Sequence, residues 1–213
     1  QALIQLHHAG MRSPEKLIGE SPICPSDNEE FGARAMHLEE VHQLRDDFVT
    51  AAKRAKQCGY DGVEVHGAHG YIISQFISAE INRRQDEYGG SLVNRSRLLY
   101  EIVQGIRKQC GEGFLLGVRL SPERFGMDLE EIKTICLRLA NDYHIDFLDI
   151  SVWDYKKLPE DKRYQNQHLL NHFTELNIKN VKLTVAGKIR NAEDVQNVLN
   201  EGVDFVTIGR SAI

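Results

Sequence analysis

Residues 114–152, FLLGVRLSPERFGMDLEEIKTICLRLANDYHIDFLDISV, contain the pattern that decides the fold. The apolar run Phe114–Leu120 predicts a strand, apolar residues at helical spacing over Leu129–Tyr143 predict a helix, and Phe147–Val152 predicts a second strand. Asp128, with Glu131 three residues later, is typical of a helix N-cap with a reciprocal acid, and Asn191 with Asp194 is similar. A helix that connects two strands in this way makes them parallel, so the stretch predicts a βαβ unit.

The alternation of strands and helices continues toward both ends of the chain. Further strands are predicted at Ala2–His7, Gly62–His66, Leu183–Ala186 and Phe205–Ile208, and further helices at Leu38–Cys58, Asn94–Cys110, Gln165–Leu176 and Ala192–Asn200. This order is typical of a parallel α/β sheet, either an open doubly wound sheet or a closed (β/α)8 barrel. A complete barrel has eight strands and takes about 250 residues. Six strands in 213 residues therefore predict an incomplete barrel.

Composition narrows the classes of function. The chain has 26 basic and 31 acidic side chains, a net charge of −5, and no basic stripe that would neutralise a nucleic acid. No apolar run approaches the roughly 18 residues of a membrane span, and no leader pattern opens the chain. The four cysteines are widely spaced, which indicates reduced thiols rather than disulfides or a metal cluster. We therefore expect a cytoplasmic protein that binds neither nucleic acid nor membrane.

Each predicted strand has one apolar face and one polar face, because successive side chains point to opposite sides. Burying the guanidinium of Arg119 is costly unless an anion or a strong acceptor meets it. Parallel α/β folds bind ligands at the carboxyl ends of their strands, where the polar residues lie. We expect a ligand site there, with an internal salt bridge of Arg119 to Glu64 or Asp149 as the alternative. The polar faces carry Gln5, His7, Glu64, His66, Arg119, Ser121, Asp149, Ser151 and Thr207.

The last two predicted strands each end in a glycine followed by a base, at Gly187–Lys188 and Gly209–Arg210. Glycine lets backbone N–H groups approach an anion, and the adjacent cation adds attraction. Phosphate sites in (β/α)8 barrels are frequently built after the seventh and eighth strands. The two pairs therefore predict a phosphate site. The long irregular stretches at residues 11–34 and 153–164 also follow strands, and they are either substrate loops or variable surface loops.

Residues 61–90, DGVEVHGAHGYIISQFISAEINRRQDEYGG, are the most specific stretch of the chain. A predicted strand ends at His66, and His69 and Tyr71 follow within five residues. No third Cys, His or acidic ligand stands at a convincing spacing, so no metal is expected. A structural role, with His66 capping the strand and Tyr71 in the first turn of a helix, stays open beside a catalytic role.

Together with QLHHAG at residues 5–10, VRLSP at 118–122 and TIGR at 207–210, this stretch resembles the old yellow enzyme family of FMN-dependent NADH:flavin oxidoreductases. The resemblance runs nearly end to end and begins at the family's third strand. It implies that residues 1–213 are one partial FMN-binding (β/α)8 TIM-barrel domain, a fragment that lacks the first two strands and the closing helix.

The resemblance also implies roles for individual residues. Gln5 and Arg119 would bind the pyrimidine edge of the flavin, His66 and His69 would hold the carbonyl oxygen of the substrate, and Tyr71 would supply a proton. The segment from Asn82 to Arg97 would be architecture. The FMN phosphate would lie on Gly187, Lys188, Gly209 and Arg210. Arg12 is given no role, because Met11 separates it from Gly10 where many relatives run glycine straight into arginine.

The function expected from the resemblance is hydride transfer from NADH or NADPH, through FMN, to an α,β-unsaturated carbonyl or a similar activated alkene. Two alternatives stay open from the residues themselves. One is a flavin-independent, phosphate-handling barrel enzyme of isomerase or aldolase type, and the other is a non-catalytic flavin-binding protein. The expected partner is a small-molecule substrate, and a homo-oligomer is left open.

Overall fold

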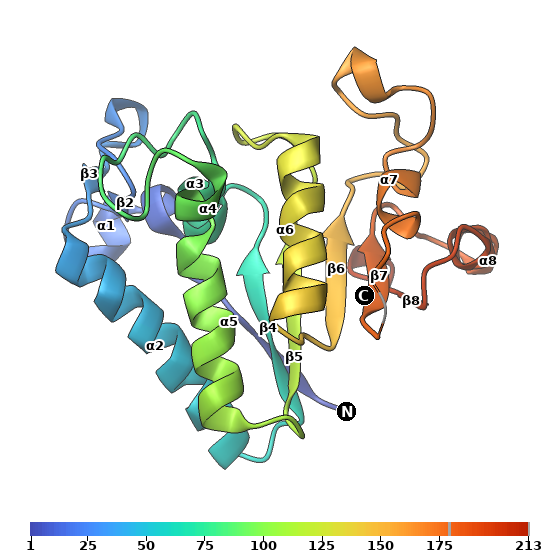
Figure 1. Cartoon of the computed structure of the whole chain (residues 1–213), viewed down its shortest axis with the longest axis horizontal. Coiled ribbons are helices and arrows are strands. Elements are labelled where there is room, and N and C mark those ends of the chain that lie inside the picture. Colours follow the sequence, from blue (N-terminus) through green and yellow to red (C-terminus); the bar gives the residue numbers. More distant parts are fainter. Residues whose placement is uncertain (179, 213) are drawn as a thin grey trace.

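Six strands form one parallel sheet within residues 1–178 and 180–212, which are the residues that this computed structural model describes. The strands lie side by side in chain order, and every pairing is parallel, so their carboxyl ends meet at one edge (Figure 1). The predicted order of the strands is confirmed, although the last strand is two residues long. The strands are β1 (Leu3–Leu6), β4 (Gly62–Gly67), β5 (Leu115–Leu120), β6 (Phe147–Ser151), β7 (Lys182–Ala186) and β8 (Phe205–Val206).

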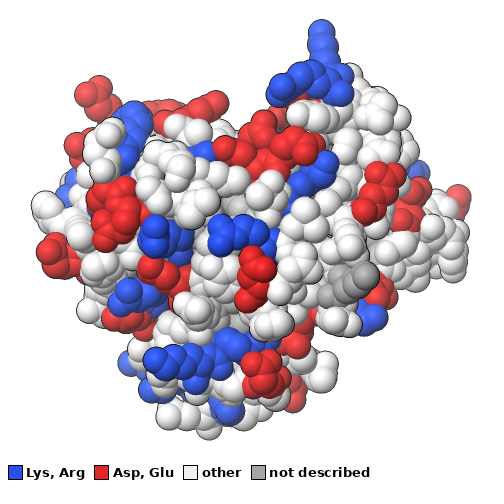
Figure 2. Space-filling view, viewed as in Figure 1, with Lys and Arg blue, Asp and Glu red and all other residues white. Residues whose placement is uncertain are grey.

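Three long helices, α2 (Leu38–Gln57), α5 (Arg97–Cys110) and α6 (Leu129–Asp142), lie along one side of the sheet (Figure 1). They cover the apolar strand faces, where Val65 of β4 and Val118 of β5 are completely buried. Burial of such a side chain stabilises the fold by about 1.5–3 kcal/mol. Acidic and basic side chains are interspersed over the surface on this side (Figure 2). None of the helices within the described residues is long and apolar enough to cross a membrane.

The opposite face of the sheet turns toward the barrel interior and is filled in layers. At the lower level the rings of Phe147 on β6 and Phe205 on β8 meet edge to face, with centroids 6.1 Å apart. Gly117 on β5 makes room for them, because a Cβ atom there would overlap the ring of Phe147. One level higher, Arg119 and Asp149 are paired in register. The ion pair of the interior face therefore lies nearer the carboxyl edge than Gly117 and the ring of Phe147.

The segment from Asn82 to Arg97 follows the loop and helix after β4 and makes several buried hydrogen bonds. That helix is α3 (Ile72–Ile77), and the segment contains α4 (Leu92–Arg95). The buried amide of Asn82 donates to the carbonyls of Phe76 at 2.6 Å and Tyr88 at 2.8 Å. The buried guanidinium of Arg95 donates to the carbonyl of Ile77 and pairs with Glu131 at 2.5 Å. These bonds fasten the segment to itself and to α6.

The stretch at residues 11–34, predicted to be irregular, contains short elements that surround a two-stranded parallel sheet of β2 (Ile23–Cys24) and β3 (Arg34–Ala35). The short helices of this region are η1 (Gly10–Arg12), α1 (Glu15–Ile18) and η2 (Glu29–Phe31). Met11, Cys24 and Ala33 bury themselves in a small apolar cluster of their own. This region therefore forms a structured loop above the end of β1.

The predicted helix at Gln165–Leu176 is wrong. The structure has only η3 (Lys162–Tyr164) and α7 (Asn171–Thr174) there. Gln165 bonds back to the carbonyl of Pro159 at 2.8 Å, and the backbone N–H of Leu169 donates to the carbonyl of Lys157 at 2.7 Å. The apolar residues at helical spacing are explained by Leu169 and Leu170, which a folded-back loop buries in the core. The loop thus covers the core where a helix was predicted to pack.

The predicted helix caps are confirmed on one side only. Asp128 accepts from the backbone N–H groups of Glu130 and Glu131, and Asn191 accepts from that of Asp194 at the start of α8 (Ala192–Asn200). The expected reciprocal bonds do not form. Glu131 pairs with Arg95, and Asp194 accepts from the backbone N–H of Arg190 at 3.0 Å. Glu131 thus serves a tertiary contact, and so does Asp194, which also accepts from the hydroxyl of Tyr155 at 2.8 Å.

Replacing Gly117 by alanine should destabilise the fold. The new methyl group would overlap the ring of Phe147, which must move within the interior layer, and overpacking of this kind costs about 1–3 kcal/mol. Urea unfolding of Gly117→Ala measures this loss. Gly113→Ala is the matched control, because a Cβ there meets nothing within 4 Å and should change stability by less than about 1 kcal/mol. Equal stabilities of the two variants would contradict the interior packing.

Candidate active site

Three predicted residues come together where β4 ends. His66 lies in β4, His69 follows in a tight turn with φ of 62°, and Tyr71 is the N-cap of α3. The ring centroids of His66 lie 5.0 Å from His69 and 5.4 Å from Tyr71. The strand end and the start of the next helix thus aim all three side chains at one region, as the HxxHxY spacing indicated.

His7, at the end of β1, belongs to the same group and was given no role from the sequence. Its ring meets that of Tyr71 edge to face at 4.3 Å and lies 5.3 Å from that of His66. The only sequence signal was its position on the polar face of the first strand. Parallel pairing of β1 with β4 turns that position into a contact.

The hydrogen bonds of the two central histidines differ. The Nε2 atom of His69 lies 2.8 Å from the hydroxyl of Ser151, and its backbone N–H donates to the hydroxyl of Ser121 at 3.0 Å. The Nδ1 atom of His66 is buried and has no partner among the described residues. Buried polar atoms are normally satisfied. His69 is therefore held in place by the neighbouring strands, and His66 retains an unsatisfied hydrogen-bonding position.

Both histidines are neutral at physiological pH. Burial, with His69 and Arg119 nearby, lowers the pKa of His66 to about 3. Burial and the charge of Arg119 lower the pKa of His69 to about 4. A neutral imidazole carries one N–H donor and one acceptor nitrogen. The pair can therefore donate hydrogen bonds to an oxygen without contributing a positive charge.

Arg119 lies at the centre of the interior polar layer. Its Nε atom is 3.4 Å from a carboxylate oxygen of Asp149, and its guanidinium donates to the hydroxyl of Ser151 at 3.3 Å. The internal salt bridge expected as an alternative therefore forms with Asp149. Glu64 instead accepts from the side chain of Gln5, which is exposed. Gln5 and Arg119 thus lie on one face of the sheet but are not in contact.

The Arg119–Asp149 pair is incompletely compensated. Asp149 is 2% exposed, and its second oxygen and the Nε of Arg119 have no hydrogen-bond partner among the described residues. Burial raises the pKa of Asp149 to about 7, so its carboxyl group is partly protonated at neutral pH. Burial also raises the pKa of Glu64. The guanidinium consequently retains positive charge for a ligand at the carboxyl edge.

The two glycine–base pairs lie in neighbouring loops, as predicted. The hydroxyl of Ser211 in η4 (Arg210–Ala212) donates to the carbonyl of Ile189 at 2.9 Å, which ties the two loops together. Arg210 is exposed. The ammonium group of Lys188 is paired, because it donates to Asp154 at 2.9 Å. A loop after β6 therefore reaches the same place.

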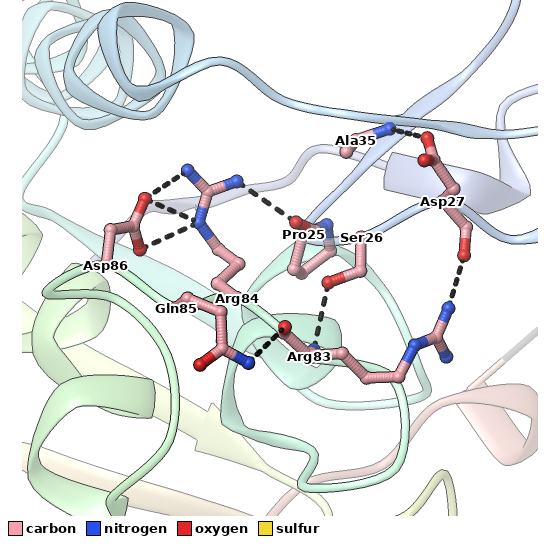
Figure 3. Close-up of a pocket in the computed structure, with 8 residues that line it drawn as sticks. All are labelled: Pro25, Ser26, Asp27, Ala35, Arg83, Arg84, Gln85 and Asp86. Carbon is pink, nitrogen blue, oxygen red and sulfur yellow. Dashed lines mark hydrogen bonds and ion pairs between the residues drawn. The ribbon is translucent and has the colours of Figure 1, made fainter.

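A broad hollow of about 560 Å³ lies away from these residues, between β3 and the segment after α3 (Figure 3). In Figure 3 the guanidinium of Arg84 faces Asp86 and the carbonyl of Pro25. It also donates to the carbonyl of Met36 at 2.6 Å. Because its donors serve to fasten loops together, we assign this hollow to the architecture and not to the active site.

Comparisons with known proteins agree with this geometry. The chain superposes on the old yellow enzyme homologue from Zymomonas mobilis with a TM-score of 0.78 and 29% identity, over 97% of this chain and 62% of that one. The six-stranded parallel sheet is thus part of an old yellow enzyme type of (β/α)8 barrel. The sequence matches the NADH:flavin oxidoreductase / NADH oxidase family over residues 1–213. The chain belongs to this family.

Two curated relatives are similar over the whole chain. The probable NADH-dependent flavin oxidoreductase YqiG of Bacillus subtilis is 34% identical over 100% of this chain and 60% of its own length. The NADH oxidase of Thermoanaerobacter brockii is 34% identical over 99% of this chain and 34% of its own length. The chain therefore spans between about a third and three fifths of these relatives.

Asp149→Asn should change how stability depends on pH. The pKa of Asp149 rises from 3.8 to about 7 on folding, so the folded chain binds more protons than the unfolded chain between these values. The contribution of Asp149 to stability then falls as pH rises through this window and is constant above about 7. We expect the unfolding free energy of the wild type, relative to Asp149→Asn, to fall between about pH 5 and pH 7 in urea titrations.

Asp204→Asn is the control for this prediction. Asp204 is exposed just before β8, where it pairs with Lys182 at 2.7 Å. This variant should keep the same fall relative to Asp149→Asn. A difference between the wild type and Asp149→Asn that does not change with pH would contradict the raised pKa of the buried acid.

Proposed function

We propose that this barrel, with bound FMN, takes hydride from NADH or NADPH and reduces an α,β-unsaturated carbonyl compound. The observation that carries the proposal is the meeting of two neutral histidines and Tyr71 beside the incompletely compensated Arg119. Membership of the NADH:flavin oxidoreductase family supports the flavin and the reductant. The proposal assigns to this chain an activity of whole relatives, of which the chain spans only part.

The residues present fit FMN. The side chain of Arg119 is 19% exposed although its Nε faces Asp149, so the outer part of the guanidinium can meet a polar ring edge. At the other end, Gly187 has no space for a side chain, since a Cβ would lie 2.7 Å from Val152, whereas nothing approaches Gly209 within 4 Å. Arg119 and Gln5 would hold the pyrimidine edge, and Gly187, Lys188, Gly209 and Arg210 would hold the phosphate.

When bound, FMN would accept hydride from the nicotinamide and deliver it to the β-carbon of the alkene. Delivery of hydride builds negative charge on the carbonyl oxygen of the substrate. The neutral rings of His66 and His69 can each donate one N–H to that oxygen. Preorganised donors of this kind act as an oxyanion hole, and loss of one typically costs about 3–4 kcal/mol of transition-state stabilisation. Ser151 of β6 bonds the ring of His69, and Ser121, just after β5, bonds its backbone N–H, so the ring is kept in position.

Tyr71 completes the reaction as the proton donor to the α-carbon. Its phenol stands beside both histidines, with ring centroids 5.4 Å from His66 and 6.4 Å from His69. The contact with His7 at 4.3 Å fixes the orientation of the ring. General acid catalysis of this kind is worth about 10²–10⁴-fold.

A visible absorption spectrum tests the proposal against its alternatives. We expect the purified protein, supplied with FMN, to be yellow, to bleach with anaerobic NADH or NADPH, and to recover its colour when an enone is added. A colourless protein that takes up no FMN would favour the flavin-independent phosphate-handling enzyme. FMN binding without oxidation of NADH or NADPH would favour a non-catalytic flavin-binding protein.

Tyr71→Phe should slow reduction of the alkene by about 10²–10⁴-fold and leave reduction of the flavin by NADH nearly unchanged. The phenol donates its proton only after hydride has reached the substrate, so only the second half-reaction depends on it. Stopped-flow absorbance measures the two half-reactions separately. An equal loss in both would show that Tyr71 is a structural residue.

Arg210→Ala should weaken retention of FMN, because an exposed cation beside Gly209 is removed from the proposed phosphate site. Flavin occupancy after dialysis, from the absorbance ratio of flavin to protein, measures this effect. Lys162→Ala is the matched control, since it removes an exposed cation in η3, outside the glycine loops. Equal occupancy in both variants would remove Arg210 from the phosphate site.

Three further expectations stay predictions. They are the cytoplasmic location, the small-molecule partner with or without a homo-oligomer, and the assignment of residues 1–213 to one partial FMN-binding domain.

A further inference from the structure

Strained backbone gathers around one small hollow beside His69. Of the seven non-glycine residues with positive φ within the described part of the chain, four line this hollow. They are His69 (62°), Arg124 (70°), Phe125 (56°) and Trp153 (69°). Bulky side chains rarely adopt this conformation, and it persists only where the surroundings enforce it. Such residues concentrate at ligand sites, so the clustering calls for a functional explanation.

The four residues come from three successive loops at the carboxyl edge, after β4, β5 and β6. Phe125 packs against the first loop, where a Cβ on Gly70 would lie 2.7 Å from its ring. The guanidinium of Arg124 lies 5.1 Å from the ring centroid of Trp153. The backbone N–H after Trp153, that of Asp154, donates to the carbonyl of Val152 at 2.8 Å and holds the turn. The loops therefore fix one another and present Trp153 as a rigid aromatic surface.

Trp153 is 59% exposed despite this support. The hollow itself has a volume of about 10 Å³, room for about one water molecule. A larger group cannot enter the hollow and must instead lie on the exposed surface of the indole ring. The ring is therefore placed as a platform beside His69 and Ser151, which line the same hollow.

The charges around the platform are paired with one another. Arg124 pairs with Glu160 at 2.5 Å, and Lys157 pairs with Glu123 and, at 2.9 Å, with Glu160. Two cations and two carboxylates thus leave no net charge in this cluster. An acidic or basic substituent gains no counter-charge here, whereas a flat uncharged ring gains stacking on the indole.

We propose that Trp153 is a specificity-determining residue that stacks on an uncharged aryl substituent conjugated to the alkene of the substrate. The assignment rests on the proposed function, because it is the carbonyl held by His66 and His69 that directs the substituent toward the β6 loop. The preferred substrates are therefore aryl enones, and non-planar alkyl enones of the same size bind and react less well.

The chain contains one tryptophan, so its indole N–H gives a single assignable NMR signal. We would titrate the ¹⁵N-labelled chain with 4-phenyl-3-buten-2-one and, separately, with 4-cyclohexyl-3-buten-2-one, which replaces the flat ring by a puckered one. We expect a saturable shift of the Trp153 signal, with a dissociation constant about two- to tenfold lower for the phenyl compound. No saturable shift, or equal constants for the two compounds, would overturn the proposal.

Turnover by the FMN-loaded protein is the second test of the proposal. Trp153→Leu should lower kcat/KM for the phenyl enone by about two- to tenfold and leave that for the cyclohexyl enone within about twofold. Tyr60→Leu is the control, since it removes an exposed aromatic ring at the opposite end of β4. Unchanged selectivity in Trp153→Leu would also overturn the proposal. Selective binding without reduction of either enone would instead refute the proposed function and leave the aryl subsite standing.

Discussion

A guanidinium inside a parallel sheet is the constraint on which the rest of this structure depends. Arg119 cannot leave the interior, because β5 is paired on both sides and its outer face is taken by the helix layer. Asp149 on the adjacent strand β6 pairs with it, with a carboxylate oxygen 3.4 Å from the Nε of Arg119. The rings of Phe147 and Phe205 pack edge to face on the same side of the sheet, with centroids 6.1 Å apart. The interior face therefore carries its buried ion pair one level above Gly117 and Phe147.

This placement determines the character of the neighbouring side chains. A retained positive charge close to His66 and His69, added to their burial, keeps both imidazoles neutral. The same charge opposes ionisation of the histidines while it favours that of Asp149, whose burial acts in the other direction. The site thus combines one fixed cation, one acid near its midpoint of titration and two neutral donors. The protonation states of these groups are determined by burial and position more than by residue type.

The parts of the fold that local pattern determines could be predicted from the sequence. Period-two alternation assigned Arg119 and His66 to the inner face, and the spacing after β4 predicted that His66, His69 and Tyr71 meet. Contacts between distant segments could not be predicted. Such contacts depend on which loops become neighbours in space. Examples are the ion pair of Arg95 with Glu131, the folding back of residues 165–170 and the ion pair of Lys188 with Asp154. His7 belongs to the same class, since only strand pairing brings it to Tyr71.

The contact between Asp154 and Lys188 connects the loop after β6 to both the indole ring of Trp153 and a glycine loop. Asp154 follows Trp153 directly in the chain, and its carboxylate holds an ammonium group in one of the glycine loops. A phosphate that took this ammonium would compete with the carboxylate and free the backbone next to the indole ring. Thermodynamic linkage makes such an exchange reciprocal. A ligand that stabilises the indole ring would then change the affinity for the phosphate by the same factor as the phosphate changes the affinity for that ligand. The two binding sites at the barrel edge would be coupled by a single free energy.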